Sequence, residues 1–193
     1  EIGSGLVGSE MCKETVTEID DYAFSDCSAL VEVSIPSSVD EIGSCAFNYC
    51  TALSSIVIPD SVTEIEEGAF AECRALTTVV LPNFLTEISD YLFSDCTSLS
   101  DILIPASVTE IETGAFQRCT SLVSIVIPDS VTEIEDIAFS QCSALRSVLL
   151  PASVTEIGVG AFDKCPNLTL TVFRNSYAER YAQRNHIPYA YAD

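Results

Sequence analysis

The chain has 193 residues, a hydrophobic fraction of 48% and a formal net charge of −21. This composition is typical of a folded domain and excludes a disordered chain, and no apolar run reaches the roughly 18 residues that a membrane span needs. The acidic surface repels phosphate groups, which excludes nucleic acid as a partner and argues against anionic membrane surfaces.

Residues 1–12 match the pattern of the remaining chain poorly. Val7, Glu10 and Cys12 fall where later segments carry leucine, isoleucine and isoleucine, which predicts a poor strand. We therefore expect this segment to be either a degenerate N-terminal coil or cap, or the edge of a longer array of repeats.

Residues 13–173 consist of seven copies of a unit of 23 residues without insertions. The unit reads P-x-x-V-T-E-I-x-x-x-A-F-x-x-C-x-x-L-x-x-I-x-I, with Lys13 in the proline position of the first copy. The cysteines mark this spacing at Cys27, Cys50, Cys73, Cys96, Cys119, Cys142 and Cys165. Since one unit cannot bury its apolar side alone, we expect the copies to stack into a solenoid with a shared core.

Each unit predicts two short extended segments and a turn. The segment after the cysteine, for example Leu122 to Ile127, is rich in β-branched residues and ends at proline, which indicates a strand. The V-T-E-I segment indicates a second short strand, and A-F-x-x-C suits a short helical turn. With about 4.8 Å between neighbouring strands, the seven copies should form a stack roughly 34 Å long.

Residues 174–193 predict a cap made of a helix and a strand. Ser176 and Glu179 have the spacing of a capping box, in which Ser176 caps the helix and Glu179 reaches back to it. After the helix, the I-P-Y segment 187–189 is typical of a closing strand. Such a cap would cover the exposed edge of the last coil.

The strand motif L-x-x-I-x-I-P, followed by V-T-E-I-x-x-x-A-F-x-x-C, resembles the BspA-like, or Treponema-type, leucine-rich repeats over residues 13–173. The resemblance implies a β-rich α/β solenoid, a right-handed leucine-rich-repeat stack with a helical C-terminal cap. It also implies a cell-surface or secreted protein. The roles suggested for relatives include adhesion to host extracellular proteins and to other cells.

The column of cysteines is interpreted first as a row of buried free thiols. Cysteine is among the most buried residue types even when it is not bridged, and equivalent side chains should run parallel into the core. Disulfides among some of the cysteines are a second interpretation, and metal binding is a weaker one, because the spacing of zinc sites is missing. Cys12 and Cys45 lie outside the column. No cofactor or metal is expected.

A column of glutamates has the same spacing, at Glu18, Glu41, Glu64, Glu87, Glu110, Glu133 and Glu156. Like charges about 5 Å apart repel one another by roughly 0.8 kcal/mol per pair in water, so this column should face solvent. A solvated ridge that also discourages edge pairing is the favoured interpretation, with calcium binding and docking of a basic partner as alternatives.

The outward face of the strands after the cysteines is the candidate binding surface. Since side chains alternate along a strand, the position between the two inward residues should face solvent. It holds Val57, Val80, Leu103, Val126, Leu149 and Val172. The column beside it holds Ser55, Thr78, Asp101, Ser124, Ser147 and then Leu170. An aliphatic row beside hydroxyl groups indicates a contact surface, whereas the preference of valine for any strand is the alternative explanation.

These features predict a non-enzymatic protein-binding or adhesion module whose partner is a protein ligand, either from a host or a second copy of the chain. The alternative is a structural protein that self-associates through its ends or its aliphatic row into dimers or fibres. An enzyme is not expected, because no nucleophile has a neighbouring base in the sequence and a regular ridge offers no pocket. His186, the one histidine, is expected to be structural.

Overall fold

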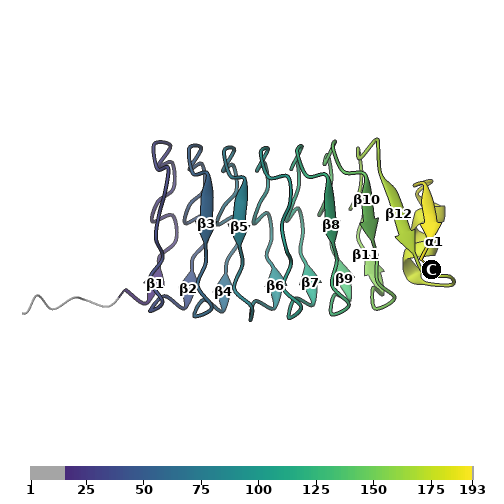
Figure 1. Cartoon of the computed structure of the whole chain (residues 1–193), viewed down its shortest axis with the longest axis horizontal. Helices are drawn as coiled ribbons and strands as arrows, with labels where there is room; N and C mark the ends of the chain where they lie inside the picture. Colours follow the sequence, from purple (N-terminus) through teal and green to yellow (C-terminus); the bar gives the residue numbers. More distant parts are fainter. Residues whose placement is uncertain (1–15, 193) are drawn as a thin grey trace, which may run out of the picture.

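The computed structural model describes residues 16–192, which form one elongated stack of coils closed by a small helical element (Figure 1). The expectation for residues 1–12 lies outside the described residues. We number the coils 1 to 7 from the repeat units, so that coil 4 is residues 82–104. The solenoid predicted from the spacing is confirmed.

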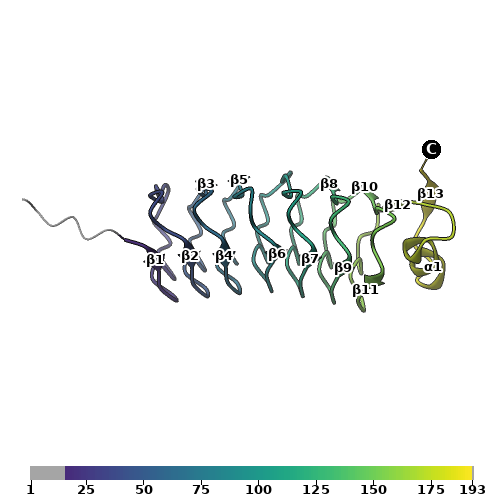
Figure 2. The same ribbon diagram turned by 90° about the horizontal axis from the view of Figure 1, so that it is seen from below.

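Two rows of short strands run along the stack (Figures 1 and 2). The row from the V-T-E-I segments consists of β1 (Glu18–Ile19), β2 (Glu41–Ile42), β4 (Glu64–Ile65), β6 (Glu87–Ile88), β7 (Glu110–Ile111), β9 (Glu133–Ile134) and β11 (Glu156–Ile157). The row after the cysteines consists of β3 (Ser55–Val57), β5 (Thr78–Val80), β8 (Ser124–Val126), β10 (Ser147–Leu149) and β12 (Thr169–Val172). The C-terminal segment adds α1 (Tyr177–Arg184) and β13 (Tyr189–Tyr191).

Neighbouring strands pair in parallel, and through most of the stack they pair in the register of the repeat. Glu41 lies opposite Glu64, and Ile125 lies opposite Val148. Each side chain therefore packs on its equivalent in the next coil, which is why one consensus serves every layer of the core.

A column of stacked phenylalanine rings runs through the core. The rings from Phe24 to Phe162 stack in order, with centroids 5.1 to 6.0 Å apart. Tyr181 of α1 closes the column with an edge contact to Phe162 at 6.3 Å. Near-parallel rings at these distances are attractive beyond their buried area.

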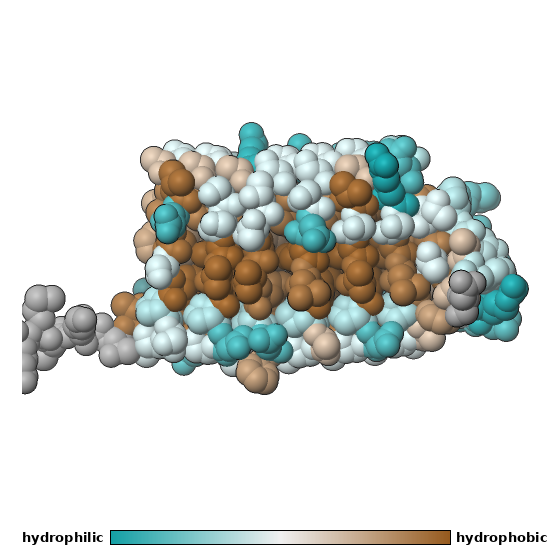
Figure 3. All heavy atoms as spheres, viewed as in Figure 1, coloured by the Kyte–Doolittle hydropathy of each residue, from teal (hydrophilic) through white to brown (hydrophobic). Residues whose placement is uncertain are grey.

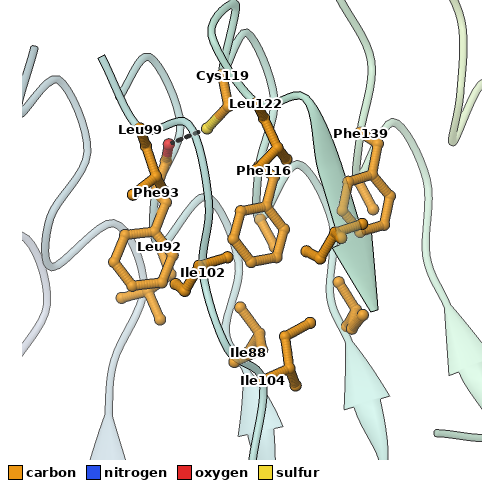
Figure 4. Packing of buried hydrophobic residues seen from close by; sticks show 14 of the residues in the cluster. Ile88, Leu92, Phe93, Leu99, Ile102, Ile104, Phe116, Cys119, Leu122 and Phe139 are labelled. Carbon is orange, nitrogen blue, oxygen red and sulfur yellow. Dashed lines mark hydrogen bonds between the residues drawn. The ribbon is translucent and has the colours of Figure 1, made fainter. Parts of the chain in front are cut away.

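The cysteines within residues 16–192 are free thiols, and six of the seven in the column hydrogen-bond to a phenylalanine carbonyl. The Cys119 Sγ donates to the Phe93 carbonyl of the preceding coil at 3.1 Å (Figure 4). Equivalent bonds of 3.1 or 3.2 Å are made by Cys50, Cys73, Cys96, Cys142 and Cys165. A thiol thus fills a small slot and satisfies a carbonyl, so the prediction of buried free thiols is confirmed along the middle of the column.

The ends of the cysteine column are more accessible. Cys27 is exposed and Cys165 is half-buried, because fewer coils cover them. Burial raises the pKa of Cys73 to about 12 and the pKa of Cys165 to about 11. The internal thiols are therefore both shielded and protonated at neutral pH.

The expected helical turn at A-F-x-x-C is wrong. The segment is a run of turns with two residues at positive φ in each coil, for example Cys45 at 54° and Tyr49 at 57° in coil 2. Positive φ breaks a right-handed helix. The amides of this segment therefore alternate between two kinds of hydrogen bond. Cys50 N donates within its own coil, to the Phe47 carbonyl at 3.1 Å, whereas Phe47 N donates to the next coil, to the Ala69 carbonyl at 2.8 Å.

The expected orientation of the last strand is also wrong. Val172 and Leu170, predicted to face outward, are fully buried. Strand β12 pairs with β10 one residue earlier than the repeat requires, so that Thr171 lies opposite Leu149. The apolar residues of T-L-T-V alternate, and burying both of them fixes this shifted register.

The C-terminal cap has the predicted helix and strand. The Ser176 hydroxyl accepts from Glu179 N at 3.0 Å, as in a capping box. The Glu179 carboxylate accepts from Asn175 N at 2.6 Å, one residue before the expected amide. Strand β13 pairs with β12 and begins at Tyr189, two residues later than predicted. No helix within residues 16–192 combines the length and the apolarity that crossing a membrane requires.

Both rows of strands are interrupted around coil 4. One sheet ends at β4 and another begins at β6, while β5 and β8 belong to different sheets. The Ser89 hydroxyl bonds to the Ile65 carbonyl, whereas in coil 3 the Glu66 amide donates to the equivalent Ile42 carbonyl at 2.9 Å. The stack is therefore least regular in its middle.

We predict that Phe116→Ala destabilises the protein by about 3–5 kcal/mol, because a fully buried ring with stacked neighbours on both sides is lost. The matched variant Phe24→Ala should cost only about 1–2 kcal/mol, because that ring is partly exposed and stacks on one neighbour. Urea denaturation followed by circular dichroism measures both losses. Equal losses would contradict a continuous column.

The thiols should fall into three classes of reactivity. In a Cys12→Ser background, a thiol reagent at pH 8 should modify Cys27 rapidly and the half-buried Cys45 and Cys165 more slowly, while the five buried thiols stay unmodified until the protein unfolds. Adding Cys27→Ser should remove the fast phase. Denatured wild-type protein without reductant should titrate all nine cysteines of the chain. A lower number would reveal disulfides.

Candidate functional site

A continuous aliphatic band crosses the face formed by the strands after the cysteines (Figure 3). The band consists of Val57, Val80, Leu103, Val126 and Leu149, whose exposed fractions are 63%, 47%, 80%, 66% and 41%. Side chains this exposed do not contribute to the core. With about 4.8 Å between coils, the band is roughly 19 Å long.

A polar column accompanies the aliphatic band. Its members are exposed: Ser55, Thr78, Asp101, Ser124 and Ser147. The strand register places neighbouring members of this column side by side: Ser55 lies opposite Thr78, and Ser124 lies opposite Ser147. At the C-terminal end, Thr169 continues this column opposite Ser147, and Thr171 rather than Val172 faces outward beside Leu149. Placing residues by the repeat length alone did not identify Thr169 and Thr171 as outward-facing. The alternation of polar and apolar residues in T-L-T-V did indicate this orientation.

The band is hollowed where the sheets are interrupted. The hollow extends from the end of coil 2 to the start of coil 5 and is lined by Val57, Val80, Leu103, Asp60 and Asn83, with Pro59 and Pro105 beside them. The Asp60 carboxylate accepts from Asn83 N at 2.8 Å and from Asn83 Nδ2 at 3.1 Å. These hydrogen bonds lower the pKa of Asp60. The aliphatic hollow thus has a fixed negative charge at its rim, which the sequence analysis did not identify.

The glutamate column lies in the other row of strands. Its side chains are exposed or half-buried, as the expected solvated ridge requires. Partial burial, and then the charges of neighbouring carboxylates, raise the pKa of Glu41, Glu87 and Glu133. Register stacking therefore has an electrostatic cost along this ridge.

Three carboxylates lie close together at coils 4 and 5. Oxygens of Glu87, Glu110 and Glu112 lie within 4.8 Å of one another, close enough to share one divalent cation. Glu112 also accepts from Asp90 N at 3.0 Å. Burial first, and then Glu87 and Asp90, raise the pKa of Glu112 to about 7.

Glu112→Gln should stabilise the protein at alkaline pH. A raised carboxyl pKa means that the folded state loses stability as the pH rises from about 4.5 through about 7, because the folded state then carries an unfavourable charge. At pH 8.5 the variant should gain on the order of 1 kcal/mol, allowing for solvent screening, or about 2–4 °C in Tm. At pH 5.5 the gain should be smaller.

Thermal melts at both pH values measure this difference. Glu135→Gln, at the same position of the next coil, controls for the loss of one negative charge. A gain for Glu112→Gln that does not depend on pH would contradict a perturbed carboxyl.

Comparison with known proteins agrees with the coil geometry. The repeat profile described as BspA type leucine rich repeat region matches residues 9–123 and 110–183, in six copies. No curated protein sequence matches the chain significantly.

Several solved structures share the fold. A T. pallidum leucine rich repeat protein superimposes with a TM-score of 0.78 and 38% identity, covering 91% of this chain and 79% of that protein. A Bacteroides ovatus leucine-rich repeat protein gives a TM-score of 0.79 with 29% identity, and the matched part is 91% of this chain but only 43% of that protein.

A leucine rich cell surface protein from Faecalibacterium prausnitzii gives a TM-score of 0.56 with 33% identity, over 81% of this chain and 58% of that protein. The family profile spans more than half of the residues, and the T. pallidum structure matches most of both chains. The chain therefore belongs to the BspA-type leucine-rich repeat family.

Proposed function

We propose that the chain is a non-enzymatic protein-binding module, with a role in adhesion, and that it binds its protein partner through the aliphatic band. The observation that carries this proposal is the exposure of five branched aliphatic side chains on consecutive coils. Contiguous apolar surface beside a polar border is typical of protein contact sites. Aliphatic and hydroxyl groups supply contact area and hydrogen bonds rather than reactive groups, so the role is binding.

The arrangement of the band favours a protein partner over a small molecule. The band is a long, shallow row in which four of the five residues lie on short strands, and adjacent positions repeat at about the spacing between strands. Small ligands are usually enclosed in concave pockets, whereas rows of this kind match an extended surface. A place on the cell surface or in secretions is part of the proposal, supported by the family and by the description of the Faecalibacterium prausnitzii protein as a cell surface protein.

Val80→Lys combined with Val126→Lys should abolish binding and leave the fold intact. Both side chains are exposed, so lysine is tolerated there, but its charge disrupts an apolar contact. Binding to an immobilised basement-membrane extract should weaken by at least about tenfold, which corresponds to roughly 1.4 kcal/mol. Surface plasmon resonance measures the affinity, and circular dichroism checks the fold.

Val31→Lys combined with Val159→Lys is the matched control, because it adds the same charge at exposed aliphatic residues outside the band. Light scattering over a range of concentrations separates the alternative function. A wild-type protein that forms dimers or fibres, together with a monomeric Val80→Lys/Val126→Lys variant, would contradict the proposal and support self-association through the band.

A further inference from the structure

Coil 4 has a larger core than the coils around it. Leu92 occupies the position that is alanine in every other coil, and Leu85 replaces the valine of the consensus. Both leucines are fully buried. Leucine has three more carbons than alanine, and extra carbons in a packed core displace their neighbours.

The stacked rings are spaced more widely on both sides of Phe93, the residue that follows Leu92. The ring of Phe93 lies 6.0 Å from Phe70 and 5.6 Å from Phe116, whereas the other rings of the column lie 5.1 to 5.3 Å apart. The hydrogen bond from Phe70 N to the Leu92 carbonyl is 3.1 Å long, and its equivalents in the other coils are 2.7 or 2.8 Å. The core is therefore spaced more widely at the ring that follows Leu92.

The spread core coincides with the loss of strand pairing and with the hollow in the aliphatic band. The segment 101–104 of coil 4 forms no strand, and it lies between β5 and β8, which belong to separate sheets. Leu103 of this segment is 80% exposed, the highest value in the band, and it lines the hollow with Val57 and Val80. A regular stack would present the same surface at every coil, whereas the surface at coil 4 differs from that of the neighbouring coils.

The charged side chains around the hollow and beside the band are predominantly acidic. Asp60 lines the hollow, and Asp101 and Asp129 are exposed beside the band. Arg146 is the basic residue that precedes the band in coil 6. The chain as a whole has 29 acidic and 8 basic residues. This charge attracts basic segments and repels acidic ones.

We propose that the hollow at coil 4 is the anchor point of the aliphatic band, and that it takes a protein segment in which an aliphatic side chain is flanked by lysine or arginine. The aliphatic side chain packs against Val57, Val80 and Leu103, and the basic group pairs with Asp60 or Asp101. Leu92 is a positioning residue: it lies in the core and keeps the hollow open by holding the neighbouring coils apart. This proposal rests on the proposed function, since it specifies the partner of the same surface.

A short fluorescent peptide of alternating lysine and valine is the probe, with two matched peptides as controls. One control replaces lysine with glutamate, and the other replaces valine with serine. Fluorescence anisotropy with the full chain should show binding of the lysine–valine peptide alone, and rising salt should weaken it. Equal binding of the glutamate–valine peptide would overturn the basic partner but leave the aliphatic band as a binding surface.

Surface variants locate the peptide. Leu103→Ser should weaken binding of the peptide by about tenfold or more, because one aliphatic contact is lost. Val159→Ser, which changes an equally exposed residue outside the band, should leave binding unchanged. Asp60→Asn with Asp101→Asn should weaken binding and reduce its salt dependence, while Asp26→Asn on the turns should not. Failure of every peptide to bind, or equal effects of the test and control variants, would overturn the proposal.

The role of Leu92 is tested without changing the surface. Leu92→Ala with Leu85→Val restores the consensus core, so the coils should close, the hollow should shrink and the lysine–valine peptide should bind about tenfold more weakly. Hydrogen exchange at the Thr86 and Ser89 amides should slow as pairing is restored. Unchanged peptide affinity with slowed exchange would overturn the role of Leu92. If this variant unfolds, the single variant Leu85→Val applies the same readouts to a smaller change.

Discussion

The structure depends on parallel stacking of equivalent residues in register. When Glu41 lies opposite Glu64, every other residue of the two coils also lies against its equivalent. Each consensus residue must therefore pack on copies of itself. Phenylalanine meets this requirement by ring stacking, and cysteine meets it by being small and by donating its thiol to the Phe carbonyl of the preceding coil. The consensus thus contains residues that pack well against copies of themselves in the neighbouring coils.

The same stacking brings like charges together, and the chain uses part of that charge for hydrogen bonds between coils. Glu66 accepts from the Ser44 hydroxyl at 2.6 Å, and Glu135 accepts from the Thr113 hydroxyl at 2.7 Å. Glu112 does the same with the Asp90 amide at 3.0 Å. Each bond joins a carboxylate to the coil before it, and such charge-assisted bonds offset part of the repulsion along the ridge. The acidic ridge is therefore part of the stack as well as a solvated surface.

A repeating surface offers a partner many equivalent positions, and specificity requires a difference among them. In this chain the difference begins in the core, where Leu92 and Leu85 enlarge coil 4, and it reaches the surface at Leu103 and Asp60. Because packed interiors transmit changes of volume, a buried substitution alters an exposed face several residues away. The aliphatic band provides the contact area for a partner, and the irregular coil 4 determines where along the band the partner binds.

The repeat length, the core columns, the cap and the outward position of Val57 through Leu149 follow from the residue pattern alone, because a fixed period leaves one way to bury every apolar column. Other features depend on contacts between coils, which only the folded structure contains. Val172 turned inward, since the last strand pairs with β10 and β13 in a shifted register that buries Leu170 as well. The A-F-x-x-C segment became turns, because its amides bond across coils as well as within them. The hollow beside Leu103 depends on how far Leu92 spreads its neighbours, a distance that packing sets and that residue spacing does not contain.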